Sequence, residues 1–179
     1  MTPTALLCHP AGPVPAGIAV SAAATWGAGG ELQLHYRISG PIDALIIPEP
    51  ASPEDTDGLW QHTCCEAFAA AVDGPDYREF NLSPSGCWAA YRFTDYRQRD
   101  AAWQPPAAPR IDCRREGDSL VLAASVPAAL LPPVARLRVG LTAVLEAANG
   151  DRSYWALHHA GARPDFHLRS SFTLDLNRP

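Results

Sequence analysis

Apolar and polar residues alternate strictly over several short stretches of this chain. In residues 31–38, leucine, tyrosine and isoleucine alternate with glutamine, histidine and arginine. Residues 136–146 repeat the pattern over a longer stretch, with polar groups on the second face. A period of two residues is that of a β-strand with one buried face. We therefore predict half-buried strands in both places.

Further short apolar runs predict more strands, and turn-forming residues separate them. These strands are predicted at residues 17–24, 61–72, 77–82, 87–93, 111–115, 119–126, 153–158 and 171–176. Glycine, aspartate, asparagine and proline supply turns at residues 27–30, 73–76, 83–86, 116–118 and 149–151. Proline removes a backbone donor, so crossover loops are predicted at the proline-rich residues 41–53, 103–109 and 127–133. Short helical turns are predicted at residues 54–58 and 126–131.

About ten short strands with this punctuation predict an all-β fold with little helix. The expected architecture is an antiparallel β-sandwich of jelly-roll or immunoglobulin-like type. A length of 179 residues predicts one domain, residues 1–179, with its core over about residues 17–176.

Composition excludes several classes of protein. The basic residues are all arginine and the net charge is -5, which argues against a nucleic-acid partner. The first residues lack the pattern of a secretory signal, and no apolar run approaches the roughly 18 residues of a membrane span. We expect a cytoplasmic protein with no membrane partner. The five cysteines include no Cys-x-x-Cys pair, which predicts free thiols.

Polar residues with one parity mark a candidate binding face. Trp60 and Glu66 share a face in the alternation over residues 59–68, and Glu79 and Asn81 share a face of the next strand. On that strand, Phe80 and Leu82 point the other way, toward the core. If the two strands pair, the carboxyl and amide groups come together.

Further polar and aromatic groups occur later in the chain. Arg92, on the following strand, is predicted to balance the carboxylates through bidentate hydrogen bonds. Near the C-terminus Trp155, His159, Asp165 and His167 form a dense set. A flat aromatic ring beside carboxyl, amide and guanidinium groups suits a sugar, because the ring covers C–H groups while the polar groups bond to hydroxyls.

Each of these features has a structural alternative. The tryptophans Trp60, Trp88 and Trp155 are also explained by packing in the core or at its rim. The polar cluster is also explained as a buried network that fixes strand register. Adjacent histidines and cysteines on a strand point to opposite faces, so no metal site is predicted. An interaction domain that pairs through an edge strand is a further alternative.

Four segments together resemble a known family. They are LWQHTCCEAF (59–68), YREFNLSPSGCWAAYRF (77–93), SYWALHH (153–159) and PDFH (164–167). In combination they resemble bacterial DOMON-like proteins, which are related to family-nine carbohydrate-binding modules, over roughly residues 17–176. The resemblance implies a β-sandwich that binds sugar or haem, with Trp60, Glu66, Asn81, Trp155 and His159 or His167 near the binding region.

Haem is the second ligand that the resemblance implies. Haem-binding relatives use a methionine and a histidine, whereas the only methionine here is Met1. Two histidines would have to serve instead, and the candidates are His62, His159 and His167.

The sequence therefore predicts a non-catalytic domain that binds a carbohydrate or a sugar-like small molecule. Its predicted ligand-binding residues are Trp60, Glu66, Glu79, Asn81, Arg92, Trp155, His159, Asp165 and His167. No catalytic residue, metal or required cofactor is predicted. Two alternatives remain open: a haem-binding domain, and a glycoside hydrolase that uses Glu66 and Glu79 as its carboxyl pair.

Overall fold

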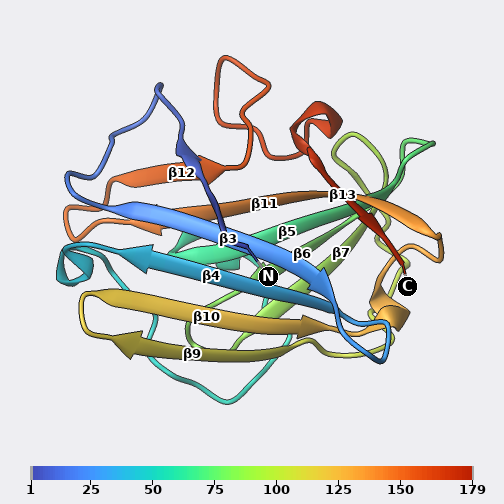
Figure 1. The fold of residues 1–179 in the computed structure, drawn as a ribbon, viewed down its shortest axis with the longest axis horizontal. Helices are drawn as coiled ribbons and strands as arrows, with labels where there is room; N and C mark the ends of the chain where they lie inside the picture. The colour runs from blue at the N-terminus through green and yellow to red at the C-terminus, as the bar shows by residue number, and fades with distance from the viewer. Residues whose placement is uncertain (1, 179) are drawn as a thin grey trace.

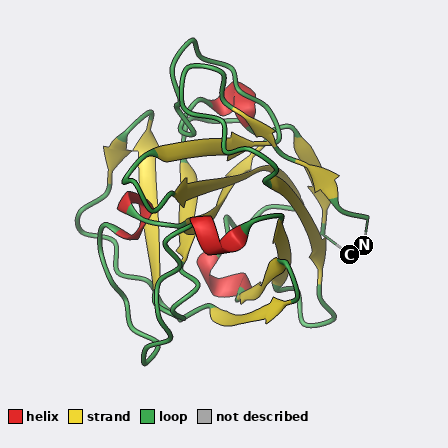
Figure 2. Ribbon diagram, turned by 90° about the vertical axis from the view of Figure 1, so that its left-hand side faces the viewer, coloured by secondary structure: helices red, strands yellow, loops and turns green. Residues whose placement is uncertain are grey.

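Two antiparallel β-sheets pack face to face and form a β-sandwich (Figure 1 and Figure 2). The structure is a computed structural model, and it describes residues 2–178. The five-stranded sheet has the order β1 (Thr4–Ala5), β3 (Ala19–Trp26), β4 (Leu32–Ser39), β10 (Ser119–Val126) and β9 (Arg110–Glu116). All its neighbouring strands run antiparallel.

The eight-stranded sheet forms the second layer. Along it lie β2 (Leu7–Cys8), β12 (Arg152–Ala156), β11 (Arg136–Glu146), β5 (Cys64–Ala71), β6 (Tyr77–Leu82), β7 (Trp88–Asp95) and β8 (Gln98–Arg99). The remaining strand, β13 (Leu174–Asn177), pairs with β11. The only helical segments in residues 2–178 are the 3-10 turns η1 (Ile42–Ala44), η2 (Leu59–Gln61), η3 (Ala128–Leu130) and η4 (Arg169–Ser171).

The predicted all-β sandwich is confirmed, and each predicted strand has a counterpart. The structure adds three strands of two residues each, β1, β2 and β8. The helical turn predicted at residues 54–58 is wrong. That segment forms a parallel bridge from Asp55 to Trp88, and the helical turn η2 follows it. All five cysteines are free, as predicted. None of the helices described is long and apolar enough to cross a membrane.

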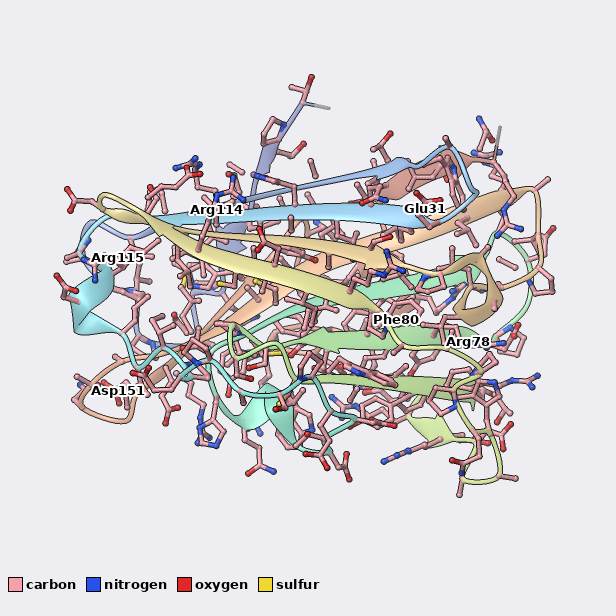
Figure 3. All side chains as sticks on the ribbon, turned by 90° about the horizontal axis from the view of Figure 1, so that it is seen from below. Glu31, Arg78, Phe80, Arg114, Arg115 and Asp151 are labelled. Atoms are coloured by element: carbon pink, nitrogen blue, oxygen red, sulfur yellow. The ribbon has the colours of Figure 1, made fainter. Side chains whose placement is uncertain are left out.

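The main core lies between the two sheets. Alternate residues of each central strand point inward, and Phe80 of β6 lies inside the sandwich (Figure 3). Tyr36 of β4 is fully buried, and its hydroxyl donates a 2.6 Å hydrogen bond to the backbone oxygen of Glu66. Burial of each large apolar side chain stabilises the fold by roughly 1.5–3 kcal/mol. This core fixes which face of β5 and β6 points outward.

The outer face of the eight-stranded sheet carries a second, largely aromatic cluster. It includes Phe68, Tyr77, Tyr91, Phe93, Phe166 and Phe172. β5 is therefore buried on both faces, unlike the alternating β4. Gly140 of β11 leaves room for this packing, since a Cβ there would lie 3.0 Å from the Phe172 ring.

Residues 157–173 cover part of this outer face. β12 pairs with the second half of β11, and β13 pairs with the first half, along the same edge. The chain between them therefore leaves the sheet, as the orange-to-red connection in Figure 1 shows. Phe166, from this connection, packs on Phe68 with ring centres 6.5 Å apart. The connection forms one wall of a cavity on the outer face.

Candidate ligand-binding site

A cavity of about 550 Å³ opens on the outer face of the eight-stranded sheet. Its floor comes from β5, β6, β7, β11 and β12. Its walls come from the η2 region, the β7–β8 turn and residues 157–173. The lining residues are Asp57, Trp60, Glu66, Phe68, Glu79, Tyr91, Phe93, Arg97, Arg99, Val144, Tyr154, Arg163, Pro164, Asp165, Phe166 and His167. Most binding cavities have this size and this mixture of aromatic and polar groups.

Strand pairing places two carboxyl groups in the floor. β5 and β6 pair so that Glu66 lies opposite Asn81 and Phe68 lies opposite Glu79. Glu66 and Glu79 are thus diagonal neighbours on one face, while Phe80 points into the core. The predicted parity is confirmed, and the three polar side chains lie together.

Glu66 is 2% exposed and receives little compensation for its burial. Its Oε2 accepts a 3.3 Å hydrogen bond from the Thr142 hydroxyl, and its Oε1 has no hydrogen-bond partner within residues 2–178. Burial, with the neighbouring Glu79 carboxyl second, raises the pKa of Glu66 well above its usual value. Burial therefore favours the protonated form of this carboxyl group.

Glu79 is also buried but is better hydrogen-bonded. Its Oε1 accepts a 2.8 Å hydrogen bond from the amide of Asn81. Burial raises the pKa of Glu79 to about 7, and the Asn81 bond acts in the opposite direction. The carboxyl is therefore near its titration point at neutral pH.

His167 reaches the floor from the covering connection. Its Nδ1 lies 2.8 Å from the Tyr77 hydroxyl, and its Nε2 lies 3.8 Å from Oε2 of Glu79. The Tyr77 oxygen already accepts from the backbone N–H of Arg97, so we assign the hydroxyl proton to the bond with Nδ1. Burial lowers the pKa of His167 to about 4, and the imidazole is neutral, with its proton on Nε2.

Two arginines at the rim are each held by a carboxylate. Arg97 donates to Asp165 at 3.0 Å, from a left-handed backbone position with φ of 54°. Arg99 lies 3.6 Å from Asp57 and stacks over the Tyr91 ring at 4.1 Å. These pairs fix the β7–β8 turn against both walls.

Trp60 provides the exposed aromatic surface of the cavity. It belongs to η2, which follows Gly58 at a φ of 79°. This positive φ favours glycine and turns the chain out of line with β5. Half of the Trp60 side chain is exposed. The ring therefore offers an apolar plane at the cavity mouth.

The structure brings together five of the nine predicted site residues at the cavity lining, and a sixth supports it. Those that line it are Trp60, Glu66, Glu79, Asp165 and His167. Asn81 lies beneath them and bonds to Glu79.

Three predicted residues lie elsewhere, and their placement must be corrected. Arg92 points to the other side of β7, where it lies 3.8 Å from Asp100, so it does not balance the carboxyl groups. Trp155 is 5% exposed, belongs to the core between the sheets, and donates to Ser153. His159 contacts the ring of His9 and bonds to the backbone oxygen of Leu7. None of the three lines the cavity.

Several lining residues escaped the sequence interpretation. Tyr91 lies directly opposite Glu79 in the β6–β7 pairing, and Phe93 lies opposite Tyr77. The turn at residues 83–86 was recognised, but counting outward from it pairs Leu82 with Cys87 and Glu79 with Ala90. The observed pairing of Leu82 with Trp88 takes one more residue and brings Tyr91 opposite Glu79. Arg97 lies in the β7–β8 turn, Arg99 follows it, and Arg163 belongs to the connection of residues 157–173. No periodic pattern predicts where such side chains point.

The haem hypothesis does not fit this arrangement. Of its three candidate histidines, only His167 lines the cavity. His62 bonds to Glu146 at 2.8 Å, and His159 bonds to the backbone of Leu7. The cavity therefore does not receive the two imidazoles that haem would need. Residues 2–178 also contain no cluster of side chains suited to a metal ion.

Comparison with known proteins identifies the fold but no family. The sequence matches no family model and no curated protein. A structurally similar protein is one from Bacteroides uniformis that has been proposed to bind carbohydrate. It is 17% identical with a TM-score of 0.69, and the match covers 89% of this chain and 78% of that one.

Two further similar structures are of a family-nine carbohydrate-binding module from Caldicellulosiruptor kristjanssonii. The complex with glucose has a TM-score of 0.62 at 8% identity, covering 96% of this chain and 82% of that chain. The complex with cellotriose has a TM-score of 0.58 at 9% identity, covering 96% and 80%. At these identities the likeness establishes a shared β-sandwich fold.

Proposed function

We propose that the protein binds a saccharide without transforming it, in the cavity on the outer face of the eight-stranded sheet. The observation that carries this proposal is the pairing of a half-exposed tryptophan with buried carboxyl groups around one cavity of about 550 Å³. The fold likeness to carbohydrate-binding modules supports it. The resemblance of residues 59–68, 77–93, 153–159 and 164–167 to DOMON-like proteins is consistent with the same ligand class.

The cavity offers complementary surfaces to the two sides of a sugar ring. The plane of Trp60 covers C–H groups, and carboxyl and imidazole groups bond to hydroxyls. A protonated carboxyl both donates and accepts, as does a sugar hydroxyl. In that form Glu66 is suited to exchange hydrogen bonds with the hydroxyls of a sugar.

Calorimetric titration with monosaccharides and short oligosaccharides tests the proposal. Glucose and cellotriose are the first probes, because the similar module binds them. Trp60→Ala is expected to weaken a measured affinity by about 5-fold or more, the effect of losing an interface aromatic worth over about 1 kcal/mol. Trp60→Phe should retain part of the affinity, and Val72→Ala, which removes an exposed apolar side chain outside the lining, should retain all of it. Equal affinities for Trp60→Ala and the wild type would refute the proposed site.

A glycoside hydrolase using the same carboxyl pair is the second candidate. It is favoured by the location of Glu66 and Glu79 in one cavity. Such an enzyme needs one protonated and one ionised carboxyl group, and here burial raises the pKa of both. Incubation with aryl glycosides distinguishes the candidates, because only the hydrolase would release the aryl alcohol and lose this activity in Glu66→Gln.

A further inference from the structure

The cavity floor contains more hydrogen-bond acceptors than donors. Glu66 Oε1 has no partner among the residues that the structure describes, although the side chain is almost fully buried and lines the cavity. Glu79 Oε2 lies 3.8 Å from Nε2 of His167, which is too long for a hydrogen bond. Glu66 and Glu79 thus line the same cavity, and each has one carboxyl oxygen without a hydrogen bond.

Apart from the Nε2–H of His167, which lies 3.8 Å from Glu79 Oε2, the donors near these oxygens are already in use. The Asn81 amide donates to Glu79 Oε1, and the Thr142 hydroxyl donates to Glu66 Oε2. At the rim, Arg97 is held by Asp165 and Arg99 by Asp57. Within residues 2–178, no arginine therefore contacts the two carboxyl groups of the floor.

Aromatic rings surround this acceptor-rich floor. Phe68 and Phe93 line it from the sheet, Tyr91 lies beside Glu79, and Trp60 stands at the mouth. Aromatic faces attract cations, and buried carboxyl groups do so more strongly. A sugar hydroxyl carries one hydrogen to donate, whereas an ammonium group carries three.

We infer that the floor formed by Glu66 and Glu79 takes a primary ammonium group, so that, resting on the proposed function, the ligand class is an amino sugar. The ammonium bonds to Glu66 Oε1 and Glu79 Oε2, and the sugar ring extends toward Trp60. Without ligand, burial favours the protonated form of both carboxyl groups, because it raises the pKa of each. Binding of the cation releases these protons.

Arg163 is the charged lining residue that would favour an anionic sugar instead of an amino sugar. It lines the cavity from the covering connection, and it forms no ion pair with the other described residues. Its side chain is exposed, however, and solvent screens its charge. A sugar acid would place its carboxylate there, whereas the buried floor selects for a cation. The two ligand classes are separable by experiment.

Calorimetry with four probes at about pH 6.5 tests the inference: glucosamine, glucose, N-acetylglucosamine and glucuronate. An amine with a pKa near that of an α-amino group, about 7.7–8.0, is protonated there. Glucosamine is expected to bind on the order of 10-fold more tightly than glucose or N-acetylglucosamine, because charged hydrogen bonds are stronger than neutral ones. Titrations in buffers of different ionisation enthalpy should detect proton release for glucosamine alone.

Glu66→Gln is expected to reduce the preference for glucosamine over glucose to about 3-fold or less. Glu79→Gln provides a second variant of the same floor. Glu49→Gln is the matched control, since Glu49 is exposed and lies outside the lining, and it should keep the preference. Retention of the preference in both floor variants would overturn the inference.

The probes also separate this inference from the proposed function. Equal binding of glucose and glucosamine, or tightest binding of glucuronate, contradicts the ammonium site and leaves saccharide binding intact. Binding of none of the four probes contradicts the proposed function and the ammonium site together.

Discussion

Glu79 and His167 are neighbours in the cavity floor whose protonation changes in opposite directions on folding. Burial raises the pKa of Glu79 from 4.5 to about 7 and lowers the pKa of His167 from 6.5 to about 4. Between pH 4.5 and 6.5 the folded protein holds a neutral carboxyl beside a neutral imidazole. The unfolded chain holds a carboxylate and an imidazolium. The two states therefore bind the same number of protons at this pair.

The stability contributions of the two groups oppose each other. Because the pKa of Glu79 is raised on folding, its contribution is fully present below pH 4.5 and is lost as the pH rises toward about 7. Because the pKa of His167 is lowered, its contribution is present above pH 6.5 and is lost as the pH falls toward about 4. At about 1.4 kcal/mol per pH unit, each amounts to about 3 kcal/mol over its range. The pair therefore adds little net pH dependence to the free energy of unfolding between pH 4.5 and 6.5.

Removing either residue leaves the pH dependence of the other uncompensated in the free energy of unfolding. Relative to the wild type, the free energy of unfolding of Glu79→Gln is expected to rise by about 3 kcal/mol between pH 4.5 and 6.5. That of His167→Gln is expected to fall by about the same amount. Urea unfolding, followed by tryptophan fluorescence at several pH values in this range, measures both. Comparison with the wild type removes the contribution of Glu66 in His167→Gln, which keeps both carboxyl groups. In Glu79→Gln the neighbouring carboxyl that helps to raise the pKa of Glu66 is absent, so His167→Gln is the cleaner variant.

Glu49→Gln is the control, and its unfolding free energy should run parallel to that of the wild type. If both cavity variants also run parallel to the wild type, or shift in the same direction, the opposed titration of the pair is refuted.

Three further predictions concern packing and thiol chemistry. Gly140→Ala is expected to cost about 1–3 kcal/mol in the free energy of unfolding, since the new Cβ would lie 3.0 Å from Phe172; thermal denaturation measures this, and an unchanged melting temperature would contradict it. Trp155→Ala is expected to destabilise the fold by about 3–5 kcal/mol while a folded fraction keeps its ligand affinity, which denaturation and calorimetry at low temperature separate. Cys64 and Cys65 should not react with an aromatic disulfide reagent in the native state, because burial raises the pKa of both thiols well above the usual value; rapid labelling of both would contradict their burial.

The strands were the most predictable part of the fold. β6, β10 and β11 have the bounds that alternation and turn residues predict. β1, β2 and β8 were missed because two residues cannot show a period, and these strands exist only through pairing with longer neighbours. The start of β5 was placed too early, because the turn η2 interrupts the apparent alternation before it.

The site was predictable where it lies on strands. Parity alone placed Glu66, Glu79 and Asn81 together, because β5 and β6 are adjacent and their core residues are unambiguous. Parity does not say which layer a face meets, and Trp155 was therefore assigned to the ligand although it points into the sandwich. Arg92 was misplaced because the loop before β7 takes one residue more than the predicted turn, which shifts the pairing and turns Arg92 to the opposite face.

Residues that reach the cavity from turns and connections lay beyond such reasoning. Trp60 was named as part of a strand face, yet it arrives through η2. His167 and Asp165 were named as a dense polar set, yet their position depends on the path of residues 157–173 over the sheet. Tertiary packing of Phe166 and Phe172 on Phe68 decides that path.

The arrangement of β12 and β13 along one edge of β11 also bears on how this protein can diversify. Because both strands are anchored independently, the segment that connects them can gain or lose residues without disturbing any pairing in the sandwich. That segment supplies Asp165, Phe166 and His167 to the cavity. Changes in the length or sequence of this one segment therefore alter the shape and lining of the cavity while the strands of the scaffold stay the same.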